Sequence, residues 1–434
     1  MPVRGTGLRP SAPRLLLVLT EMPPAVGGMQ THARHLAAHL ARAGAAIEVL
    51  SYRVTDPTLA AQAHNFDRAC GYPVRRVLSR LGFWHNLELI AERIRSFRPD
   101  AVYASTVFYG LLKARTPLPL LCRSVGNDVL RPWLGYPYPW CSEALGAPAM
   151  QRALRWWMEH GHHPDWVDRL FRQSRERLMR QGARSHSRIL ANSGYTAALL
   201  QGIGVDPGRI EVVSGGVDAV SFLPPADARA ASRQALGIAP DDQVLLTVCR
   251  LVAKKGVEVL LDAVASLRPM HPRLKLLIVG DGVRRRRYEV RTQALGLQDC
   301  VRFVGRVPHE QVAPYFWASD AFALASYESR HAGGAARDVE TMGRVLCEAN
   351  AAGLPVVASA TGGTPSVLRD GDNGLLVAPS DAPALAEAIA RVLGAPALAL
   401  RLSQAGLRRA REEFDWSAVM ARHERALESA IHAA

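Results

Sequence analysis

The sequence predicts an α/β protein with two Rossmann-like domains, each built on a doubly wound parallel sheet. The chain has 434 residues, which is too long for one ordinary core, because single domains usually hold about 100–200 residues. Short apolar runs alternate with longer segments in which apolar residues recur every three or four positions. This pattern is typical of parallel strands with helices over both faces. It starts again after residue 222, so we expect two domains in tandem.

The first half contains short apolar runs that we predict as strands, at 14–20, 46–51, 101–104, 119–122 and 188–191. Segments such as 29–43 and 87–97 lie between them and have the apolar spacing of helices. Basic residues precede the first run, as in a signal peptide. The run is nevertheless shorter than the ~7–15 apolar residues that such a peptide needs. We therefore predict a buried first strand there.

The second half repeats this order after a turn-rich break at 224–227. Its predicted strands are 244–248, 274–279, 301–304, 321–324 and 356–358. Helical stretches separate these runs as well, and the sequence has no short-period repeat of the kind that builds solenoids. Two consecutive Rossmann-like units are the simplest account of this pattern.

The composition excludes an intrinsically disordered chain, because 48% of the residues are hydrophobic and 21% are charged. No run reaches the ~18–20 apolar residues of a membrane-spanning helix. Six cysteines occur without paired C-x2-C spacing. We therefore expect reduced, buried thiols in a cytoplasmic protein, with peripheral contact with the inner face of the cell membrane as a further option.

Positive charge is concentrated in the first half of the chain. Residues 1–200 hold 26 Lys and Arg against 13 Asp and Glu, whereas the remainder holds 27 against 26. This asymmetry suggests an anionic partner, such as lipid headgroups, a phosphorylated acceptor or nucleic acid. Aromatic residues and arginines are concentrated in 131–186. This composition is typical of a segment that contacts an anionic membrane or binds a phosphorylated acceptor. An amphipathic helix with solvated arginines explains the same pattern.

The strongest local motif is a pair of acidic residues, Glu340 and Glu348, near the start of a predicted helix. About two helical turns separate them, so they can contact two parts of one elongated ligand. Arg250 ends a predicted strand and Lys255 precedes a predicted helix. Ligands of open α/β sheets bind beyond the carboxyl ends of the strands, and two cations there suit a diphosphate.

Two other clusters point to a site less strongly. His160, His162 and His163 lie beside Asp165 and could ligate a metal, but they lack a standard ligand spacing, which favours a solvated turn. Four arginines at 284–287 could bind nucleic acid, but no aromatic stacking platform accompanies them. We expect neither a metal site nor a nucleic-acid site.

In order and spacing, the motifs resemble the family 4 glycosyltransferases of the GT-B fold, which are retaining enzymes that use nucleotide sugars. The resemblance covers nearly the whole second half, through the E-x7-E pair, the R-x4-K-G loop, and the segments 301–307 and 372–377. In the first half it is thinner and rests on 27–32, 126–128, 189–193 and 213–218. Phe414, Asp415 and Trp416 resemble the start of the family's terminal helix, which packs back onto the first domain.

The resemblance implies two Rossmann-like domains that face each other across a cleft. The N-terminal domain, 1–222, is expected to bind the acceptor, and the last helix, 417–434, is expected to return to it. The C-terminal domain, 223–416, is expected to bind the nucleotide-sugar donor.

The same resemblance implies roles for the donor-side motifs. Arg250 and Lys255 would hold the donor diphosphate, Glu348 would bind the ribose, and Glu340 would contact the transferred sugar. The remaining donor-side positions are expected to offer backbone to the phosphates or to the base. They are Gly343, Arg344, Val345, Gly305, Arg306, Val307 and Gly363.

On the acceptor side, Gly27 and Gly28 would let the first domain close over the donor, and Asp128 would face the cleft. Two departures from the family pattern are visible. Thr341 and Met342 follow Glu340, where the family often has Gly and Phe. The loop in which many members carry a His holds Arg123, which either substitutes for that His or has a structural role.

The implied activity is transfer of a sugar from a UDP- or GDP-linked donor to a hydroxyl of a glycan or lipid-linked acceptor, in the synthesis of cell-surface polysaccharide or glycolipid. We expect no cofactor and no divalent metal, because fixed cations and amide dipoles can stabilise the departing diphosphate. Retention by same-face attack is implied by the family alone. Two alternatives stay open: a nucleotide-sugar 2-epimerase of the same fold, and a non-catalytic protein that binds an anionic surface or nucleic acid.

Overall fold

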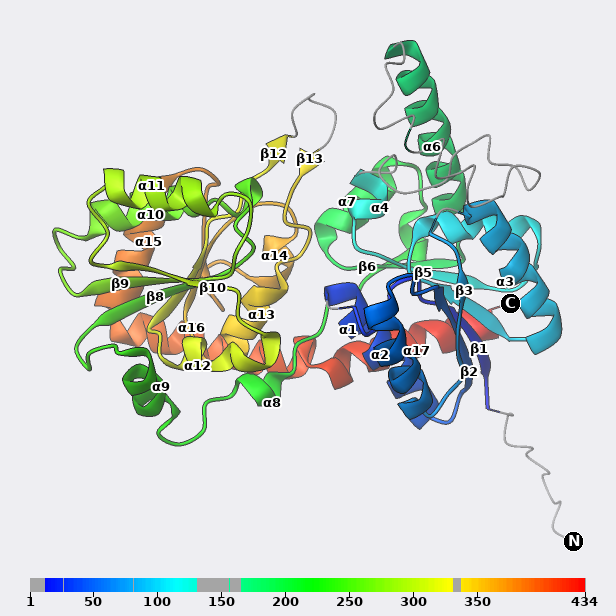
Figure 1. The fold of residues 1–434 in the computed structure, drawn as a ribbon, viewed down its shortest axis with the longest axis horizontal. Helices are drawn as coiled ribbons and strands as arrows, with labels where there is room; N and C mark the ends of the chain where they lie inside the picture. Colours follow the sequence, from blue (N-terminus) through cyan, green and yellow to red (C-terminus); the bar gives the residue numbers. More distant parts are fainter. Residues whose placement is uncertain are drawn as a thin grey trace, which may run out of the picture.

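The structure is a computed structural model that describes residues 12–25, 27–80, 82–130, 156, 165–330 and 337–433. Two parallel sheets lie side by side, each with helices on both faces (Figure 1). The fold class predicted from the sequence, two Rossmann-like domains, is therefore confirmed.

The first sheet has the strand order β3-β2-β1-β4-β5-β6-β7. Its strands are β1 (Arg14–Val18), β2 (Ala46–Tyr52), β3 (Val74–Leu78), β4 (Ala101–Ala104), β5 (Leu120–Ser124), β6 (Arg188–Ala191) and β7 (Ile210–Val212). Its α-helices are α1 (Gly28–Arg42), α2 (Pro57–Ala69), α3 (Phe83–Phe97), α4 (Asn127–Leu130), α6 (Asp165–Ser185) and α7 (Gly194–Gly202).

Alternation along the central strand β1 explains how both faces of this sheet are covered. Leu16 and Val18 belong to the apolar cluster that includes residues of α3 and α6. Leu15 and Leu17 belong to the cluster on the other face, which includes residues of α1 and of the last helix, α17 (Trp416–His432). Because successive side chains of a strand point to opposite faces, an apolar run such as Leu15–Val18 must be covered on both sides.

The second sheet has the order β10-β9-β8-β11-β14-β15. Its strands are β8 (Gln243–Val248), β9 (Leu274–Val279), β10 (Val301–Gly305), β11 (Ala321–Leu324), β14 (Val356–Ser359) and β15 (Leu375–Val377). Its α-helices are α9 (Ala228–Leu236), α10 (Val257–Leu267), α11 (Arg285–Ala294), α12 (Ala313–Trp317), α13 (Arg344–Ala351), α14 (Thr364–Val367), α15 (Ala382–Gly394) and α16 (Pro396–Arg409). A small antiparallel pair, β12 (Ser329–Arg330) and β13 (Arg337–Asp338), extends from this domain.

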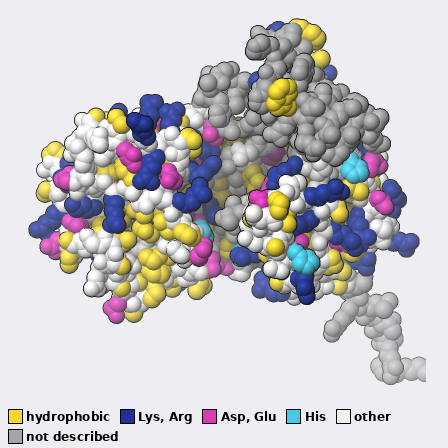
Figure 2. Space-filling view, in the orientation of Figure 1, with side chains coloured by type: hydrophobic (Ala, Val, Ile, Leu, Met, Phe, Trp, Pro, Cys, Tyr) yellow, Lys and Arg dark blue, Asp and Glu magenta, His cyan; other side chains and the backbone are white. Residues whose placement is uncertain are grey.

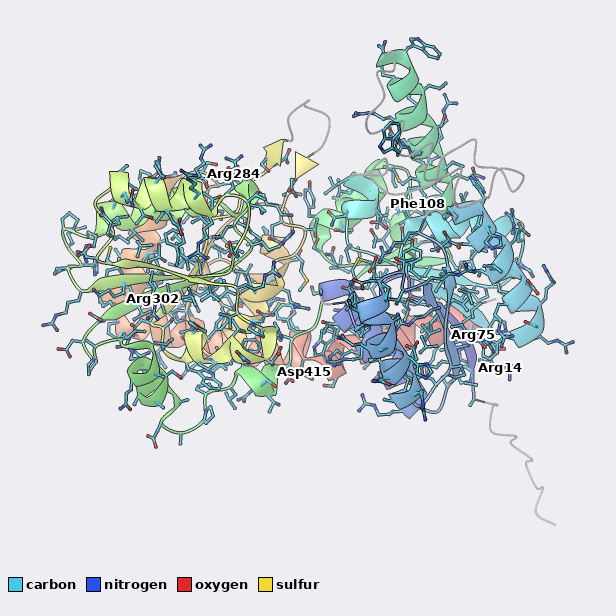
Figure 3. The ribbon with its side chains drawn as sticks, viewed as in Figure 1. Arg14, Arg75, Phe108, Arg284, Arg302 and Asp415 are labelled. Carbon is cyan, nitrogen blue, oxygen red and sulfur yellow. The ribbon has the colours of Figure 1, made fainter. Side chains whose placement is uncertain are left out.

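The chain crosses between the domains at two adjacent places. Val217 and Asp415 form a parallel bridge, in which the Val217 amide donates to Phe414 O at 2.8 Å and the Trp416 amide donates to Val217 O at 3.1 Å. Asp415, labelled in Figure 3, then caps α17, because its carboxylate accepts from the Ser417 amide at 2.9 Å. Helix α17 runs back along the first domain (Figure 1), as the resemblance implied.

The core of the second domain includes residues on the N-terminal side of the expected division at 222/223. Val217, Ala219 and Phe222, the last two in the short helix α8 (Ala219–Phe222), pack into it. Within the described part of the chain, no single helix is both long and apolar enough to cross a bilayer. By length and composition alone, one bent pair, Ala382–Gly394 with Pro396–Phe414, passes that test.

Candidate functional site

A cavity of about 480 Å³ lies between the two domains. Gly27, Gln30 and Arg34 line it from the first domain, and Arg344 and Glu348 line it from the second. Figure 2 views the molecule from a side on which a furrow separates the two domains. Ligands of parallel α/β folds bind where the carboxyl ends of strands open into such a crevice.

Lys255 and Glu340 form a partly buried ion pair on the second domain. Lys255 ends a short 3-10 turn, Ala253–Lys255, after β8, and its ammonium contacts the Glu340 carboxylate. Burial opposes the charge on Lys255, but the Glu340 carboxylate outweighs it and raises the pKa of Lys255. Burial likewise opposes the charge on Glu340, but Lys255 lowers the pKa of that carboxyl. Both side chains therefore stay charged at neutral pH.

Close backbone contacts fix this pair. Gly256 has φ of 61°, and a Cβ atom there would lie 1.8 Å from Ala325 O, so only glycine fits beside Lys255. The Gly363 amide donates to Glu340 O at 2.8 Å, and a Cβ atom on Gly363 would lie 1.9 Å from Thr341 O. Gly363 thus holds the loop that carries Glu340.

Lys254 binds the segment immediately before Glu340. Its ammonium lies 2.8 Å from Asp338 Oδ1 and donates to Val339 O at 3.1 Å. Two consecutive lysines of one turn therefore anchor the approach to Glu340 and the Glu340 carboxylate itself.

Glu348 is buried on α13, and its carboxylate is held by the side chains of His309 and Arg344. Its Oε1 atom lies 3.0 Å from His309 Nε2 and 3.4 Å from Arg344 Nε. Burial acts to raise the pKa of Glu348, but the hydrogen bond with His309 and the charge of Arg344 lower it overall. Gly343, with φ of 85°, precedes the helix, so Glu340 lies in the loop before α13 and Glu348 lies on the helix.

Arg250 is exposed, and its side chain has no hydrogen bond or ion pair with any described residue. The positive charge of Arg250 nevertheless acts on Lys255, because it lowers the pKa of Lys255 and so partly offsets the increase caused by Glu340. The second domain therefore brings a paired lysine and an unpaired arginine close together, an arrangement that can accept a diphosphate.

From the first domain, the glycines before α1 approach the second. Gly27 lines the cavity, and a Cβ atom on Gly28 would lie 3.6 Å from Arg344 Nη1. The domains also touch where Asn192 Nδ2 donates to Thr341 Oγ1 at 3.4 Å and the Gly194 amide donates to Ser366 Oγ at 2.9 Å. The loop around Glu340 is therefore in contact with both domains.

Asp128 is engaged within the first domain. Its carboxylate accepts from Ser124 Oγ at 2.7 Å and from the Val107 amide at 3.1 Å. Burial raises the pKa of Asp128. Asp128 does not line the cavity described above, so its bonds are those of a residue that braces the end of β5.

The predicted base loop lies beside the cavity and does not line it. Gly305, with φ of 88°, ends β10, Arg306 is exposed and Val307 packs on the second core. Val345 also packs on that core, in the first turn of α13. The base loop leads to His309, whose ring binds Glu348.

Several lining residues were missed by sequence reasoning. His309, Arg34, His35, Asp218 and Trp416 all line the cavity. His309 is 39 positions from the carboxylate that it binds, and a lone histidine in a loop has no distinguishing pattern. Asp218 and Trp416 had a signal, because Asp218 belongs to the segment 213–218 that carries the resemblance and Trp416 starts the helix that was expected to return to the first domain.

Other candidate clusters have local partners or lie outside the described residues. Arg285 donates to Glu289 at 2.8 Å and lies 3.4 Å from Asp281, and Figure 3 places the neighbouring Arg284 on the surface of the second domain. The group at His160, His162 and His163 lies outside the described residues, as does most of 131–164. In the described part of the chain, no group of three or more His, Cys, Asp or Glu side chains is placed to hold a metal ion.

The sequence contains one Asp-x-Asp, at Asp370 and Asp372. It lies in the turn before β15, where Asp370 Oδ1 accepts from the Leu376 amide at 2.8 Å. This carboxylate holds its own turn, and neither aspartate lines the interdomain cavity.

Comparison with known proteins gives two family matches. Residues 26–220 match Glycosyltransferase Family 4, and residues 228–409 match the glycosyl transferases group 1. A GDP-mannose-dependent alpha-(1-6)-phosphatidylinositol monomannoside mannosyltransferase of Mycolicibacterium smegmatis is 30% identical over 292 residues, which cover 67% of this chain and 74% of that protein.

Two further proteins are similar over different lengths. D-inositol 3-phosphate glycosyltransferase 2 of Catenulispora acidiphila is 36% identical over 244 residues, which cover 54% of this chain and 54% of that protein. The match therefore spans about half the length of that relative. The solved structure of Anabaena Alr3699/HepE in complex with UDP has a TM-score of 0.71 at 20% identity, and the match covers 96% of this chain and 100% of that one.

Proposed function

Because the chain belongs to the family 4 glycosyltransferases of the GT-B fold, we propose that it moves a sugar from a UDP- or GDP-linked donor to a hydroxyl of a glycan or lipid-linked acceptor. We propose further that the product belongs to cell-surface polysaccharide or glycolipid. The partly buried contact of Lys255 with Glu340, beside the unpaired side chain of Arg250, is the observation that carries this proposal.

The donor is proposed to bind along the second domain. Arg250 and Lys255 take the diphosphate, and Glu348, held by His309 and Arg344, binds the ribose hydroxyls. Glu340 contacts the transferred sugar. Relatives support this assignment: the mannosyltransferase named above is GDP-mannose-dependent, and Alr3699/HepE was solved with UDP.

The proposed chemistry is substitution at the anomeric carbon with retention. The bond between that carbon and the phosphate oxygen breaks, and the acceptor oxygen forms a new bond on the same face. The acceptor proton passes to the leaving phosphate. Negative charge develops on the departing nucleotide, and Arg250, Lys255 and the amides at the start of α13 stabilise it without reorganisation. We propose that no divalent metal is needed, because these groups supply the positive charge.

The first domain is proposed to bind the acceptor and to contact an anionic membrane from the cytoplasmic side. Helix α6 supports the membrane contact, because Trp166 and Leu170 are 61% and 50% exposed and Arg169 and Arg177 are exposed beside them. An apolar and cationic surface of this kind suits an interface with anionic lipid.

The membrane proposal predicts that vesicles containing anionic lipid recruit the protein at low salt, and that high salt reduces recruitment. Exchanging Arg169 and Arg177 for Gln should weaken partitioning by about 1 kcal/mol for each charge. Vesicle co-sedimentation measures this effect, with neutral phosphatidylcholine vesicles as the control. Absence of recruitment at low salt would contradict the membrane contact and leave an acceptor-binding or solvated helix.

The activity is tested by mass spectrometry across a panel of UDP- and GDP-sugars with glycan and lipid-linked acceptors. We expect transfer with the wild-type protein and a loss of about 100-fold or more in Glu340→Gln, because an interaction with the reacting sugar is removed. Glu387→Gln, at an exposed position on α15, is the matched control. Wild-type turnover in Glu340→Gln would contradict the catalytic assignment, and an isomerised donor in the absence of acceptor would favour the epimerase alternative.

A further inference from the structure

Arg123, near the end of β5, is buried without a partner. Its side chain is 8% exposed and makes no hydrogen bond or ion pair with the residues that the structure describes. Its Nε atom is among the buried polar atoms that lack a partner. An unpaired guanidinium in such a position is costly, because burial removes its hydration without replacing it. Binding of an anion would stabilise an unpaired, buried guanidinium of this kind.

Two carboxylates close to Arg123, those of Asp128 and Glu21, are occupied by other groups. Asp128 accepts from Ser124 and from the Val107 amide. Glu21 accepts from Arg80 at 2.8 and 3.2 Å and from Gln30 at 3.1 Å. Neither one forms an ion pair with Arg123 in the described structure, so neither of these two carboxylates supplies the missing anion.

His32, on α1, is a second unpartnered group beside Arg123. It is 4% exposed, and neither of its ring nitrogens has a hydrogen-bond partner among the described residues. His32 and Arg123 both line a small cavity of about 10 Å³, together with Tyr103, Ser105 and Glu21. This volume holds about one oxygen-sized atom. The cavity thus joins a guanidinium, an unpartnered imidazole and two hydroxyls, and its lining also includes Glu21, whose carboxylate is bound by Arg80 and Gln30.

The position is close to the proposed reaction centre. A Cβ atom on Gly215 would lie 3.5 Å from Arg123 Nη2 and 3.1 Å from Met342 Sδ. Arg123 is therefore close to Met342, which belongs to the same loop as Glu340. Gly215 also directly precedes Gly216 and Val217, which line the interdomain cavity. Arg123 therefore lies on the first-domain side of that loop.

We propose that Arg123 and His32 form a subsite for an oxyanion, a phosphate or carboxylate group of an acidic acceptor. The inference rests on the proposed function, in which the donor diphosphate lies against Lys255 and Arg250 on the other domain. One oxygen of the anion occupies the small cavity, where the Arg123 guanidinium and an N–H of His32 donate to it. The pairing of charges would compensate Arg123 only when acceptor is bound.

The test measures anion binding in protein saturated with UDP or GDP, so that the diphosphate site is filled. Inorganic phosphate and acetate are titrated separately at constant ionic strength, and the melting temperature is followed. The wild-type protein should show a saturable rise with at least one anion. The preferred anion distinguishes phosphate from carboxylate. Arg123→Met should weaken this response by about tenfold or more.

A second readout separates ligand binding from a structural role. If Arg123 is unpaired until an anion binds, the Arg123→Met variant should melt at the wild-type temperature or higher in the absence of ligand, because an uncompensated buried charge is removed. Arg95→Met, at an exposed position on α3, is the control and should keep the anion response. A lower melting temperature in Arg123→Met, or an unchanged anion response, would overturn the proposal.

Nucleotide affinity, measured in parallel, separates this subsite from the proposed function. Wild-type protein that binds neither UDP nor GDP would count against the proposed function. Normal nucleotide binding without any anion response would count against the subsite alone. If Arg123→Met loses nucleotide affinity by as large a factor as it loses anion affinity, Arg123 binds the donor and the proposal is overturned.

Discussion

Gly216 packs against the indole of Trp416 where the chain crosses between the domains. A Cβ atom on Gly216 would lie 2.2 Å from Trp416 Cε3. The indole also stacks on the His35 ring, with centroids 4.2 Å apart and planes 7° from parallel. A single glycine therefore permits the aromatic contact that joins α17 to α1.

Gly216→Ala is expected to destabilise the protein by about 1–3 kcal/mol, because overpacking forces the indole to move. Thermal or urea unfolding measures the loss. Gly202→Ala is the matched control, since no atom lies within 4 Å of the Cβ position at Gly202. Equal stability of the two variants would contradict the packing account.

At the scale of residues, the sequence identified the charged side chains of the site, but it did not predict all of the side chains that they contact. Lys255 and Glu340 are 85 positions apart, yet each follows a recognisable strand or precedes a recognisable helix, and parallel strands bring such ends together. The contact of His309 with Glu348 could not be predicted in this way, because His309 reaches its partner from an irregular loop. The expectation that Asp128 acts from the acceptor side stays a prediction.

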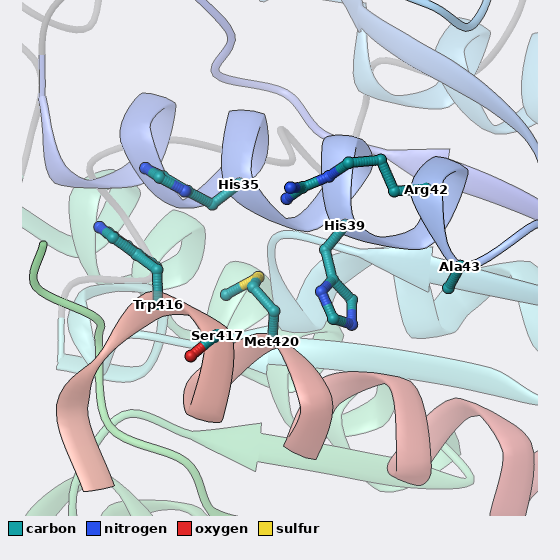
Figure 4. A pocket seen from close by; sticks show the side chains of 7 residues that line it. All are labelled: His35, His39, Arg42, Ala43, Trp416, Ser417 and Met420. Carbon is teal, nitrogen blue, oxygen red and sulfur yellow. The ribbon is translucent and has the colours of Figure 1, made fainter. Parts of the chain in front are cut away.

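Helices α1 and α17 meet over a group of buried imidazoles. The rings of His32 and His423 lie 4.7 Å apart, and His423 Nδ1 is 3.1 Å from the Tyr103 hydroxyl. A cavity of about 330 Å³ opens beside them, lined by His35, His39 and Trp416 among others (Figure 4). The two helices are therefore joined by neutral aromatic rings as well as by apolar packing.

This junction predicts acid sensitivity. Burial lowers the pKa of His35 from 6.5 to about 4, and burial together with the charge of Arg123 lowers the pKa of His32 and His423 well below 6.5. Below pH 6.5 the unfolded chain binds protons at these positions and the folded chain does not. Stability should therefore fall as pH decreases from 6.5, by about 1.4 kcal/mol per pH unit for each histidine.

Unfolding in urea at several pH values measures this slope. His423→Phe should reduce the slope of the unfolding free energy against pH by the contribution of one histidine, because one of the titrating groups is removed. His64→Gln, at an exposed position on α2, should leave the slope unchanged. An identical slope in wild type and His423→Phe would show that the junction is not the origin of acid sensitivity.

At the scale of elements, the strands of the two large sheets that the sequence missed are all edge strands. β3 and β7 lie at the two edges of the first sheet, and β15 lies at an edge of the second. The central β1 is continuously buried from Leu15 to Val18, whereas β3 is mostly half-buried or exposed, with Arg75 and Arg76 at its centre. An edge strand needs no continuous apolar run, because fewer neighbours cover it. Periodicity alone therefore underestimates the width of both sheets.

At the scale of the whole molecule, the sequence predicted two domains that face each other across a cleft and a returning helix, but it did not predict all the residues that line the cleft. The interdomain cavity is lined by residues of α1, of the crossing at Gly216–Asp218, of α13 and of α17. These segments are far apart in the chain, so only the folded arrangement brings them together. The account as a whole depends on one claim, that the second-domain side of this cleft grips a nucleoside diphosphate.

The most direct test is calorimetric titration of UDP and of GDP into wild-type protein, Lys255→Ala and Lys275→Ala. Lys275 is the matched control because it lies on β9 and donates to Asp299 O, away from Glu340. We predict that the wild type binds at least one of the two nucleotides, that Lys275→Ala binds it equally well, and that Lys255→Ala binds it more weakly by about 1.5–3 kcal/mol. Equal affinity in wild type and Lys255→Ala, or no binding of either nucleotide by the wild type, would contradict the account.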